Sequence, residues 1–109
     1  MQWEFIYYSS RVQRDILALS KELLAEFQAI KEIMGKEGPN LGMPYTRAMG
    51  DGLFEIRLSA RDGIARIFYC TIEKYEILVL HSFVKKTRKT PPAELQLAKK
   101  RLKEVKQYG

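Results

Sequence analysis

The stretch that decides the fold of this chain covers residues 75–92 and reads YEILVLHSFVKKTRKTPP. Its first half holds an unbroken aliphatic run from Ile77 to Leu80, which is typical of a strand covered on both faces. We therefore expect a central strand of a sheet rather than an edge strand. The second half brings four cations into five residues, so the strand delivers positive charge to its own end: Lys85, Lys86, Arg88 and Lys89.

The excess positive charge of the whole chain lies at this end. Residues 1–80 carry 10 Lys or Arg against 11 Asp or Glu, whereas residues 81–109 carry 9 against 2, and the net charge of the chain is +6. A basic end on a slightly acidic body favours a polyanionic partner, either nucleic acid or an acidic protein segment.

Length and composition indicate one small domain over residues 1–109, with a hydrophobic fraction of 46% that is ample for a core. No apolar run is long enough to cross a membrane, and the N-terminus lacks the features of a signal peptide, so we expect a cytoplasmic protein. The single cysteine, Cys70, excludes an internal disulfide and is expected to be a buried thiol. With only one histidine and no Cys/His spacing, neither a metal nor a cofactor is expected.

The first half of the chain predicts a strand followed by helices that cover a sheet. Residues 3–8 are aromatic and β-branched, as in a strand. Ser10 and Gln13 fit a capping box, and apolar residues then recur in steps of three and four. One helix over residues 11–36 would be ~39 Å long, too long for so small a domain to cover. We therefore expect a break near Leu19 and Ser20 and a helical hairpin.

The second half predicts an antiparallel meander and a last helix. After a loop rich in Gly and Pro and a short strand at 45–49, residues 53–58 alternate between apolar and polar. A turn at 61–63 leads to a strand at 64–72, and a second turn leads to the central strand. Thr90 is a suitable N-cap and Pro91 a suitable first residue for the last helix, whose lysines would form its solvated face.

Arg66 is the charged residue that the strand pattern explains least. It shares its face of the 64–72 strand with apolar residues, and arginine is almost never buried without a partner. Arg66 is therefore either paired with a carboxylate or lines a groove. If the three strands of the meander are neighbours, Arg57, Lys85 and Lys86 converge with it.

An RNA-cleaving site needs cations at the phosphate, a base and an acid. His81 is the one side chain with an ordinary pKa near neutrality, although a lone histidine on an apolar strand is more often a core residue. Glu55 is a candidate base or, more commonly, an ion-pair partner of Arg57. The spacing leaves ribonuclease chemistry and plain anion binding open. Candidate contacts for RNA are two aromatic rings and two further cations: Phe68, Tyr69, Arg88 and Lys89.

Three segments resemble the phage-derived, HigB-like branch of the RelE/ParE toxin superfamily: GLFEIR at 52–57, ARIFY at 65–69 and LHSFVKKTRKTP at 80–91. The expected order of elements matches as well. The resemblance implies a RelE-like α+β domain in which a twisted antiparallel sheet packs against an N-terminal helical pair and a C-terminal helix follows.

The resemblance also implies a function. Members are typically toxins of type II toxin–antitoxin systems, mRNA interferases that cut messenger RNA on the ribosome and are neutralised by a helix-turn-helix, HigA-like antitoxin. By motif, Arg57 and Arg66 match the arginines of the concave site, and Lys85 and Lys86 match its basic pair. The Tyr or His that many relatives place just after that pair is missing from residues 87–90, so charge stabilisation by Lys or Arg is expected, with His81 as the other candidate. The alternative is a non-enzymatic binding protein for RNA or for DNA gyrase, like the ParE poisons.

Overall fold

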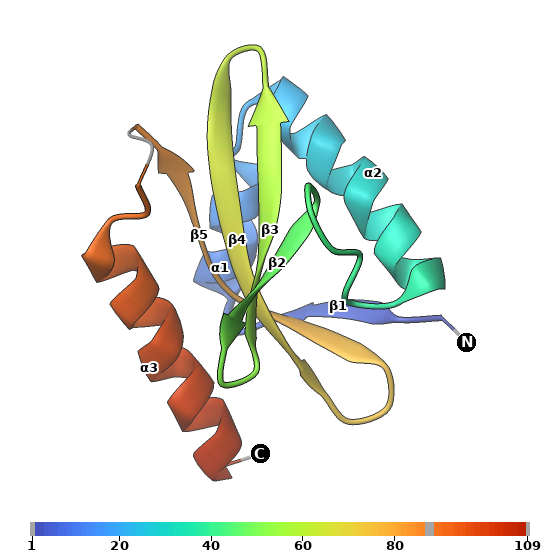
Figure 1. Ribbon diagram of the computed structural model, residues 1–109, viewed down its shortest axis with the longest axis vertical. Coiled ribbons are helices and arrows are strands. Elements are labelled where there is room, and N and C mark those ends of the chain that lie inside the picture. Colours follow the sequence, from blue (N-terminus) through green and yellow to red (C-terminus); the bar gives the residue numbers. More distant parts are fainter. Residues whose placement is uncertain (1, 87–88, 109) are drawn as a thin grey trace.

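The computed structural model describes residues 2–86 and 89–108 (Figure 1). It contains the elements β1 (Glu4–Tyr7), α1 (Ser10–Leu17), α2 (Lys21–Glu37), β2 (Thr46–Gly50), β3 (Leu53–Ala60), β4 (Gly63–Ile72), β5 (Glu76–Lys85) and α3 (Pro92–Tyr108). The fold is therefore of the α+β class, as predicted.

The five strands form one sheet in the order β1-β5-β4-β3-β2. β5 lies between β1 and β4, which confirms the prediction of a central strand, and β3, β4 and β5 form the predicted antiparallel meander. β1 runs parallel to β5, so the expectation of a wholly antiparallel sheet is wrong for this strand. Parallel neighbours need a long crossover connection, and the helices and the meander together supply it.

The helical pair breaks where the sequence indicates. The Oγ of Ser20 accepts a hydrogen bond from the amide of Leu23 at 3.3 Å and caps α2. The cap of α1 is Ser9 rather than Ser10, because Ser9 is still extended and its Oγ reaches the amide of Val12 at 3.2 Å. At the other end of the chain α3 begins at Pro92, one residue later than predicted.

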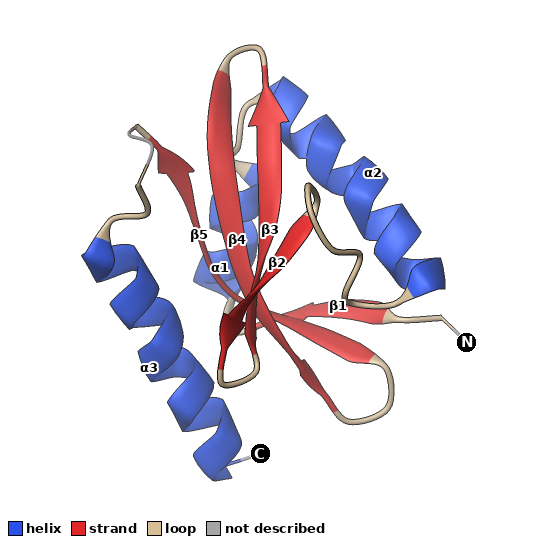
Figure 2. Cartoon of the chain, in the orientation of Figure 1, coloured by secondary structure: helices blue, strands red, loops and turns tan. Residues whose placement is uncertain are grey.

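Helices cover the two faces of the sheet unequally. α1 and α2 pack on one face, where buried apolar side chains from both helices meet those of β3, β4 and β5. α3 packs on the other face through Ala98 and Leu102, against a smaller cluster that includes Phe68, Cys70 and Leu80. Figure 2 shows α3 standing apart from α1 and α2 beside the sheet. Part of the second face is therefore left for other uses.

β5 changes the face to which its side chains point. Val79 pairs with Tyr69 and His81 pairs with Phe68, so Leu80 is an extra residue, a β-bulge. Strict alternation from Val79 would turn His81, Phe83 and Lys85 toward α1 and α2. Because of the bulge, these three side chains lie on the face of β4 that carries Phe68 and Arg66.

Candidate functional site

Neighbouring strands bring three of the four predicted cations together on the α3 side of the sheet. Arg57 of β3 and Arg66 of β4 are direct register partners, and Arg66 in turn faces Phe83 of β5. The pKa of Lys85 is lowered, first by burial and then by the charges of Arg66 and Arg57, so its ammonium lies within electrostatic reach of both. Lys86 is exposed in the bend that follows β5.

Glu55 stands at the centre of this cation cluster, which we define as Arg47, Arg57, Arg66 and Lys85. Its side chain is fully buried, and its Oε2 accepts hydrogen bonds or ion pairs from Arg57 Nη1 at 2.8 Å and Arg47 Nε at 3.0 Å. Arg66 Nε lies 3.9 Å from Oε1. Four cations around one carboxylate leave a net positive surface. The ion-pair role predicted for Glu55 is thus confirmed, whereas Arg47 was not predicted.

Arg66 is held in place by the backbone as well as by charge. Its Nη1 donates to the carbonyl of Ala65 at 3.0 Å and more weakly to that of Leu58 at 3.4 Å, and the residue is 6% exposed. Burial is the main cause of its lowered pKa, followed by repulsion from Arg57, while Glu55 acts in the opposite direction. A guanidinium fixed in this way interacts strongly with an approaching anion, because little water screens it.

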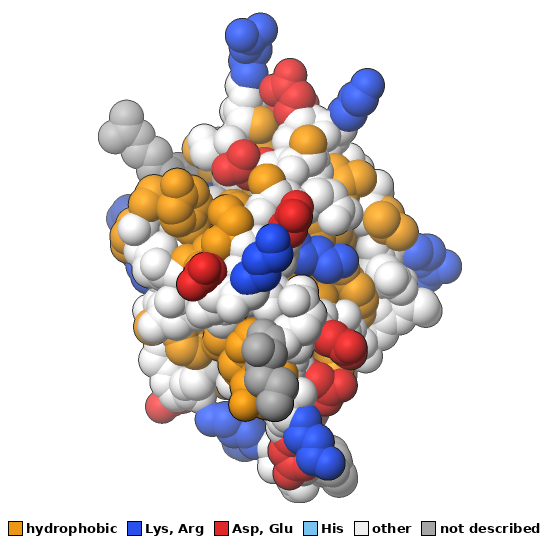
Figure 3. Space-filling view, turned by 90° about the vertical axis from the view of Figure 1, so that its right-hand side faces the viewer, with side chains coloured by type: hydrophobic (Ala, Val, Ile, Leu, Met, Phe, Trp, Pro, Cys, Tyr) orange, Lys and Arg blue, Asp and Glu red, His pale blue; other side chains and the backbone are white. Residues whose placement is uncertain are grey.

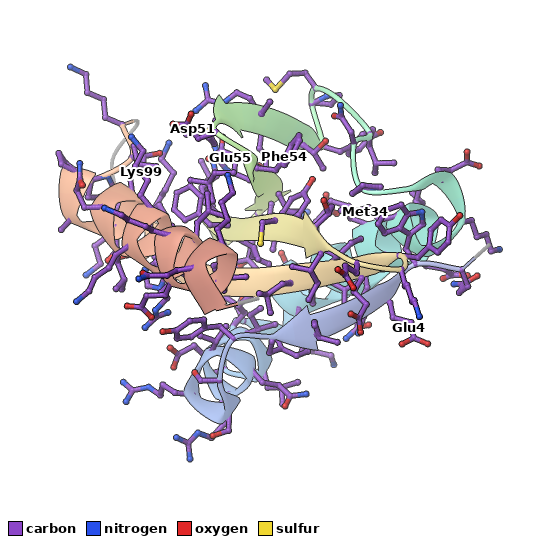
Figure 4. The ribbon with its side chains drawn as sticks, turned by 90° about the horizontal axis from the view of Figure 1, so that it is seen from below. Glu4, Met34, Asp51, Phe54, Glu55 and Lys99 are labelled. Carbon is purple, nitrogen blue, oxygen red and sulfur yellow. The ribbon has the colours of Figure 1, made fainter. Side chains whose placement is uncertain are left out.

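His81 is paired with an acidic residue of α3. Its Nε2 lies 2.7 Å from Oε2 of Glu94, and the two side chains are 13% and 31% exposed. His81 is therefore not a plain apolar core residue. The ring of Phe83 is roughly parallel to those of His81 and Phe68, with centroid distances of 6.2 and 5.8 Å. Figure 4 shows Glu55 on the sheet beside α3, the helix that supplies Glu94.

The model of a protein family described as "phage derived protein Gp49-like (DUF891)" matches residues 14–103. The chain belongs to this Gp49-like family. Its members are RelE-like toxin type proteins, so the resemblance found in the sequence is confirmed at this level, while the finer assignment to a HigB-like branch stays a prediction. The match includes every residue of the cation cluster as well as His81 and Glu94. No curated protein matches the chain.

The structure of this Gp49-like protein corrects the predicted RNA contacts. Phe68 and Tyr69 are both fully buried, so the prediction that they offer a ring to a nucleobase is wrong. β4 has a neighbour on each side and helices on each face, and Tyr69 points into the α1/α2 core, where it stacks on Phe54 and donates to the carbonyl of Pro39. The partly buried ring of Phe83 takes this place on the site face. Lys89 is exposed, and Arg88 lies outside the described residues.

Two cavities of the Gp49-like fold lie away from the cation cluster. One, of about 600 Å³, lies between β1 and α2 and is lined by residues that include Trp3 and Lys31. Another, of about 400 Å³, lies under the end of α3 and is lined by residues that include Cys70 and Val105. In the described residues no three His, Cys, Asp or Glu side chains are grouped to hold a metal, and no helix is long and apolar enough to span a membrane.

Proposed function

We propose that this protein is the toxin of a type II toxin–antitoxin system and cleaves messenger RNA on the ribosome. The observation that carries the proposal is the cation cluster on the α3 side of the sheet. Cleavage of RNA builds negative charge on the phosphate in the transition state, and preorganised cations are the groups that stabilise such charge. The membership of the chain in a family of RelE-like toxin type proteins supports the same reaction class.

The proposed reaction begins with attack of a ribose 2′-oxygen on the neighbouring phosphorus. A bond from this oxygen to phosphorus forms, the bond from phosphorus to the 5′-oxygen breaks, and the products carry a 2′,3′-cyclic phosphate and a 5′-hydroxyl. Arg57 and Arg66 hold the phosphate oxygens. His81, oriented by Glu94 at 2.7 Å, accepts the proton of the 2′-hydroxyl. Lys85, whose pKa is lowered by burial and by Arg66, donates a proton to the leaving oxygen more readily than an ordinary lysine.

Other residues bind the RNA without reacting. Phe83 lies beside Arg66 in register, so a base next to the cleaved phosphate stacks on this ring. Lys86, Arg88 and Lys89 follow β5 and attract the phosphates of the flanking nucleotides. A site on an open sheet face suits a polymer better than a small molecule.

The proposed antitoxin is a helix-turn-helix, HigA-like protein that neutralises the basic C-terminal third. Residues 81–109 carry 9 Lys or Arg against 2 acidic residues, which favours an acidic partner surface. We expect the dissociation constant of the complex to rise with salt, as measured by calorimetry at two ionic strengths. An affinity independent of salt would contradict this electrostatic contribution.

The alternative is a binding protein for RNA or for DNA gyrase that does not cleave. The observation in its favour is that Glu55 and Glu94 already pair with Arg57 and His81, an arrangement that also suits reversible anion binding.

Expression of the protein without an antitoxin tests the proposal. We expect growth arrest with rapid loss of messenger RNA, and purified protein should cut ribosome-bound messages and leave 5′-hydroxyl ends. Arrest with intact transcripts and accumulating DNA breaks would instead support the gyrase alternative.

A further inference from the structure

The β-bulge of β5 leaves one residue without a register partner in the neighbouring strand β4. Leu80 has no register partner in β4, and it is fully buried. A buried carbonyl must find a hydrogen-bond donor elsewhere or its desolvation destabilises the fold. A donor that binds the Leu80 carbonyl therefore stabilises the strand at the bulge.

That donor is Arg101 of α3. Its Nη1 lies 2.7 Å from the carbonyl oxygen of Leu80. Its guanidinium carbon lies 4.8 Å from the centre of the Tyr8 ring, and the Tyr8 hydroxyl donates to Oε2 of Glu104, one turn further along α3. Arg101 is thus fixed between the end of β1 and the bulge, which makes its donor group preorganised.

The bulge matters because it decides which side chains reach the cation cluster. A slip of one residue in a strand moves all its later side chains to the other face. Without the bulge, His81, Phe83 and Lys85 would point toward α1 and α2, away from Arg66. Two polar contacts from α3 act on consecutive residues here, Arg101 on Leu80 and Glu94 on His81.

We propose that Arg101 is a positioning residue for the reaction: by binding the bulge carbonyl it keeps the second half of β5 turned toward Arg57 and Arg66. The role in catalysis rests on the proposed function, whereas the effect on β5 does not. Arg101 does not need to touch RNA for this role. The helix that closes the second face of the sheet therefore also sets the geometry of the site.

The test compares Arg101→Ala and Arg101→Lys with Lys100→Ala. Lys100 is the neighbouring exposed cation of α3, so its variant removes the same charge without touching the bulge. For Arg101→Ala we expect kcat for ribosome-bound RNA to fall by ~10²-fold with KM unchanged, as for a misplaced reacting group. Arg101→Lys keeps a charged donor and should recover part of kcat, and Lys100→Ala should match the wild type.

Backbone amide NMR signals of residues 81–85 give a readout that does not depend on activity. We expect them to shift in Arg101→Ala and to stay in place in Lys100→Ala. If they shift in this way but the wild type does not cut RNA, the proposed function is wrong and the control of β5 by Arg101 stands. If they do not shift, the positioning role is wrong whatever the activity.

Two further outcomes count against the inference. A raised KM with normal kcat in Arg101→Ala means that Arg101 binds RNA directly. An equal loss of kcat in Lys100→Ala means that the overall charge of α3 matters rather than the bulge. If Arg101→Ala does not fold, Arg101→Lys decides: shifted amide signals of residues 81–85 and a partly lowered kcat with unchanged KM support positioning, whereas wild-type amide signals or a raised KM contradict it.

Discussion

The two faces of the sheet are formed by the same strands but serve different purposes. The face under α1 and α2 is a continuous apolar core in which β3, β4 and β5 all take part. The face under α3 has a smaller apolar cluster, and beside the helix it carries Glu55 and the cation cluster. The contrast is sharpest at Arg66 and Ile67, adjacent residues that point to opposite faces. One face supplies stability, which leaves the other free to hold charged groups at a cost in desolvation.

The outer surface of the α2 side differs again from the site. In Figure 3, which faces the side where α2 lies, acidic and basic side chains are interspersed with apolar ones. Mixed charge of this kind keeps a surface soluble and produces little net field. The cation cluster concentrates charge of one sign around a single carboxylate, and this difference supports our proposal that RNA binds on the α3 side.

The largest expected effects come from substituting Arg66 and Ile67, which are adjacent in β4, by alanine one at a time. Arg66→Ala should lower the cleavage rate by ~10²–10³-fold, because one preorganised charge is lost from the developing anion. Ile67→Ala should lower the free energy of unfolding by about 2–5 kcal/mol through a cavity in the apolar face. Ribosome-dependent cleavage and thermal melting are measured for both variants.

The expected pattern is a folded, inactive Arg66→Ala and a destabilised Ile67→Ala whose folded fraction cuts normally. Glu55 keeps its closer partners Arg47 and Arg57 when Arg66 is lost, so the stability cost should stay below the roughly 3–5 kcal/mol of a stranded buried charge. An Arg66→Ala protein that melts far lower yet still cuts when folded would falsify the catalytic role.

Glu55→Gln tests whether the carboxylate organises the cations. The change removes the charge that holds Arg47 and Arg57, which are 46% and 25% exposed and can regain water. We therefore expect a loss of about 1.5–3 kcal/mol of stability, typical of a hydrogen bond to a charged group. Activity should also fall, because the guanidiniums lose their fixed positions. Unchanged stability and activity would show that Glu55 does not anchor the cluster.

Lys85 and Lys86 differ in position and should differ in effect. Lys85 interacts with Arg66, Arg57 and Glu55, so Lys85→Ala should slow cleavage by ~10–10²-fold, less than Arg66→Ala because the ammonium is partly exposed. Lys86 is exposed beyond the strand, so Lys86→Ala should weaken RNA binding only at low salt. Stability should not change in either variant. If Lys85→Ala and Lys86→Ala have equal effects at high salt, the distinction between the two lysines is wrong.

The smallest expected effect is a loss of thermal stability at alkaline pH, to which one buried group on each face of the sheet contributes. Burial raises the pKa of Cys70, on the α3 side, from 9.0 to about 11, and that of Tyr69, on the α1/α2 side, from 10.0 to about 12. Each group binds its proton more tightly in the folded protein than in the unfolded chain. Its contribution to the free energy of unfolding is therefore complete below the pKa of the unfolded chain and is lost as the pH rises toward the pKa of the folded protein. Melting temperatures should be steady near neutrality and fall above about pH 9.

A Cys70→Ala variant isolates one of these contributions. Its decline should begin about one pH unit later, near the unfolded pKa of Tyr69 at 10.0. If the melting temperature begins to fall at the same pH in the wild type and in Cys70→Ala, groups other than Cys70 cause the fall.

The elements themselves could be predicted because their signals are local. The break at Ser20, the alternation of residues 53–58 and the aliphatic run of β5 are each decided by a few neighbouring residues. Strand order then followed from tight turns, which is why Arg57, Arg66 and Lys85 could be expected to converge. The parallel pairing of β1 could not, because it depends on a contact between residues 4–7 and 76–79, which lie far apart in the chain.

The β-bulge of β5 could not be predicted from the hydrophobic pattern of the sequence. Residues 77–80 are all aliphatic, so a shift of one residue replaces one apolar side chain by another and the alternation looks undisturbed. Phe83 was therefore not recognised as the ring on the site face. Glu94 and Arg101 were missed for a different reason, since their contacts depend on how α3 docks on the sheet. Arg47 lies in a short strand that does not alternate.

The order in which the chain is synthesised has a consequence for the cell that makes this protein. The α1/α2 core uses residues of the first 79 positions, whereas the site needs Lys85 and Glu94, and the bulge carbonyl needs Arg101. The residues of the reactive face are therefore completed later in synthesis than those of the apolar face. Under the proposed function, a chain whose last helix is not yet made lacks Glu94 and Arg101 and would carry no complete site, so only finished chains would expose the cell to cleavage.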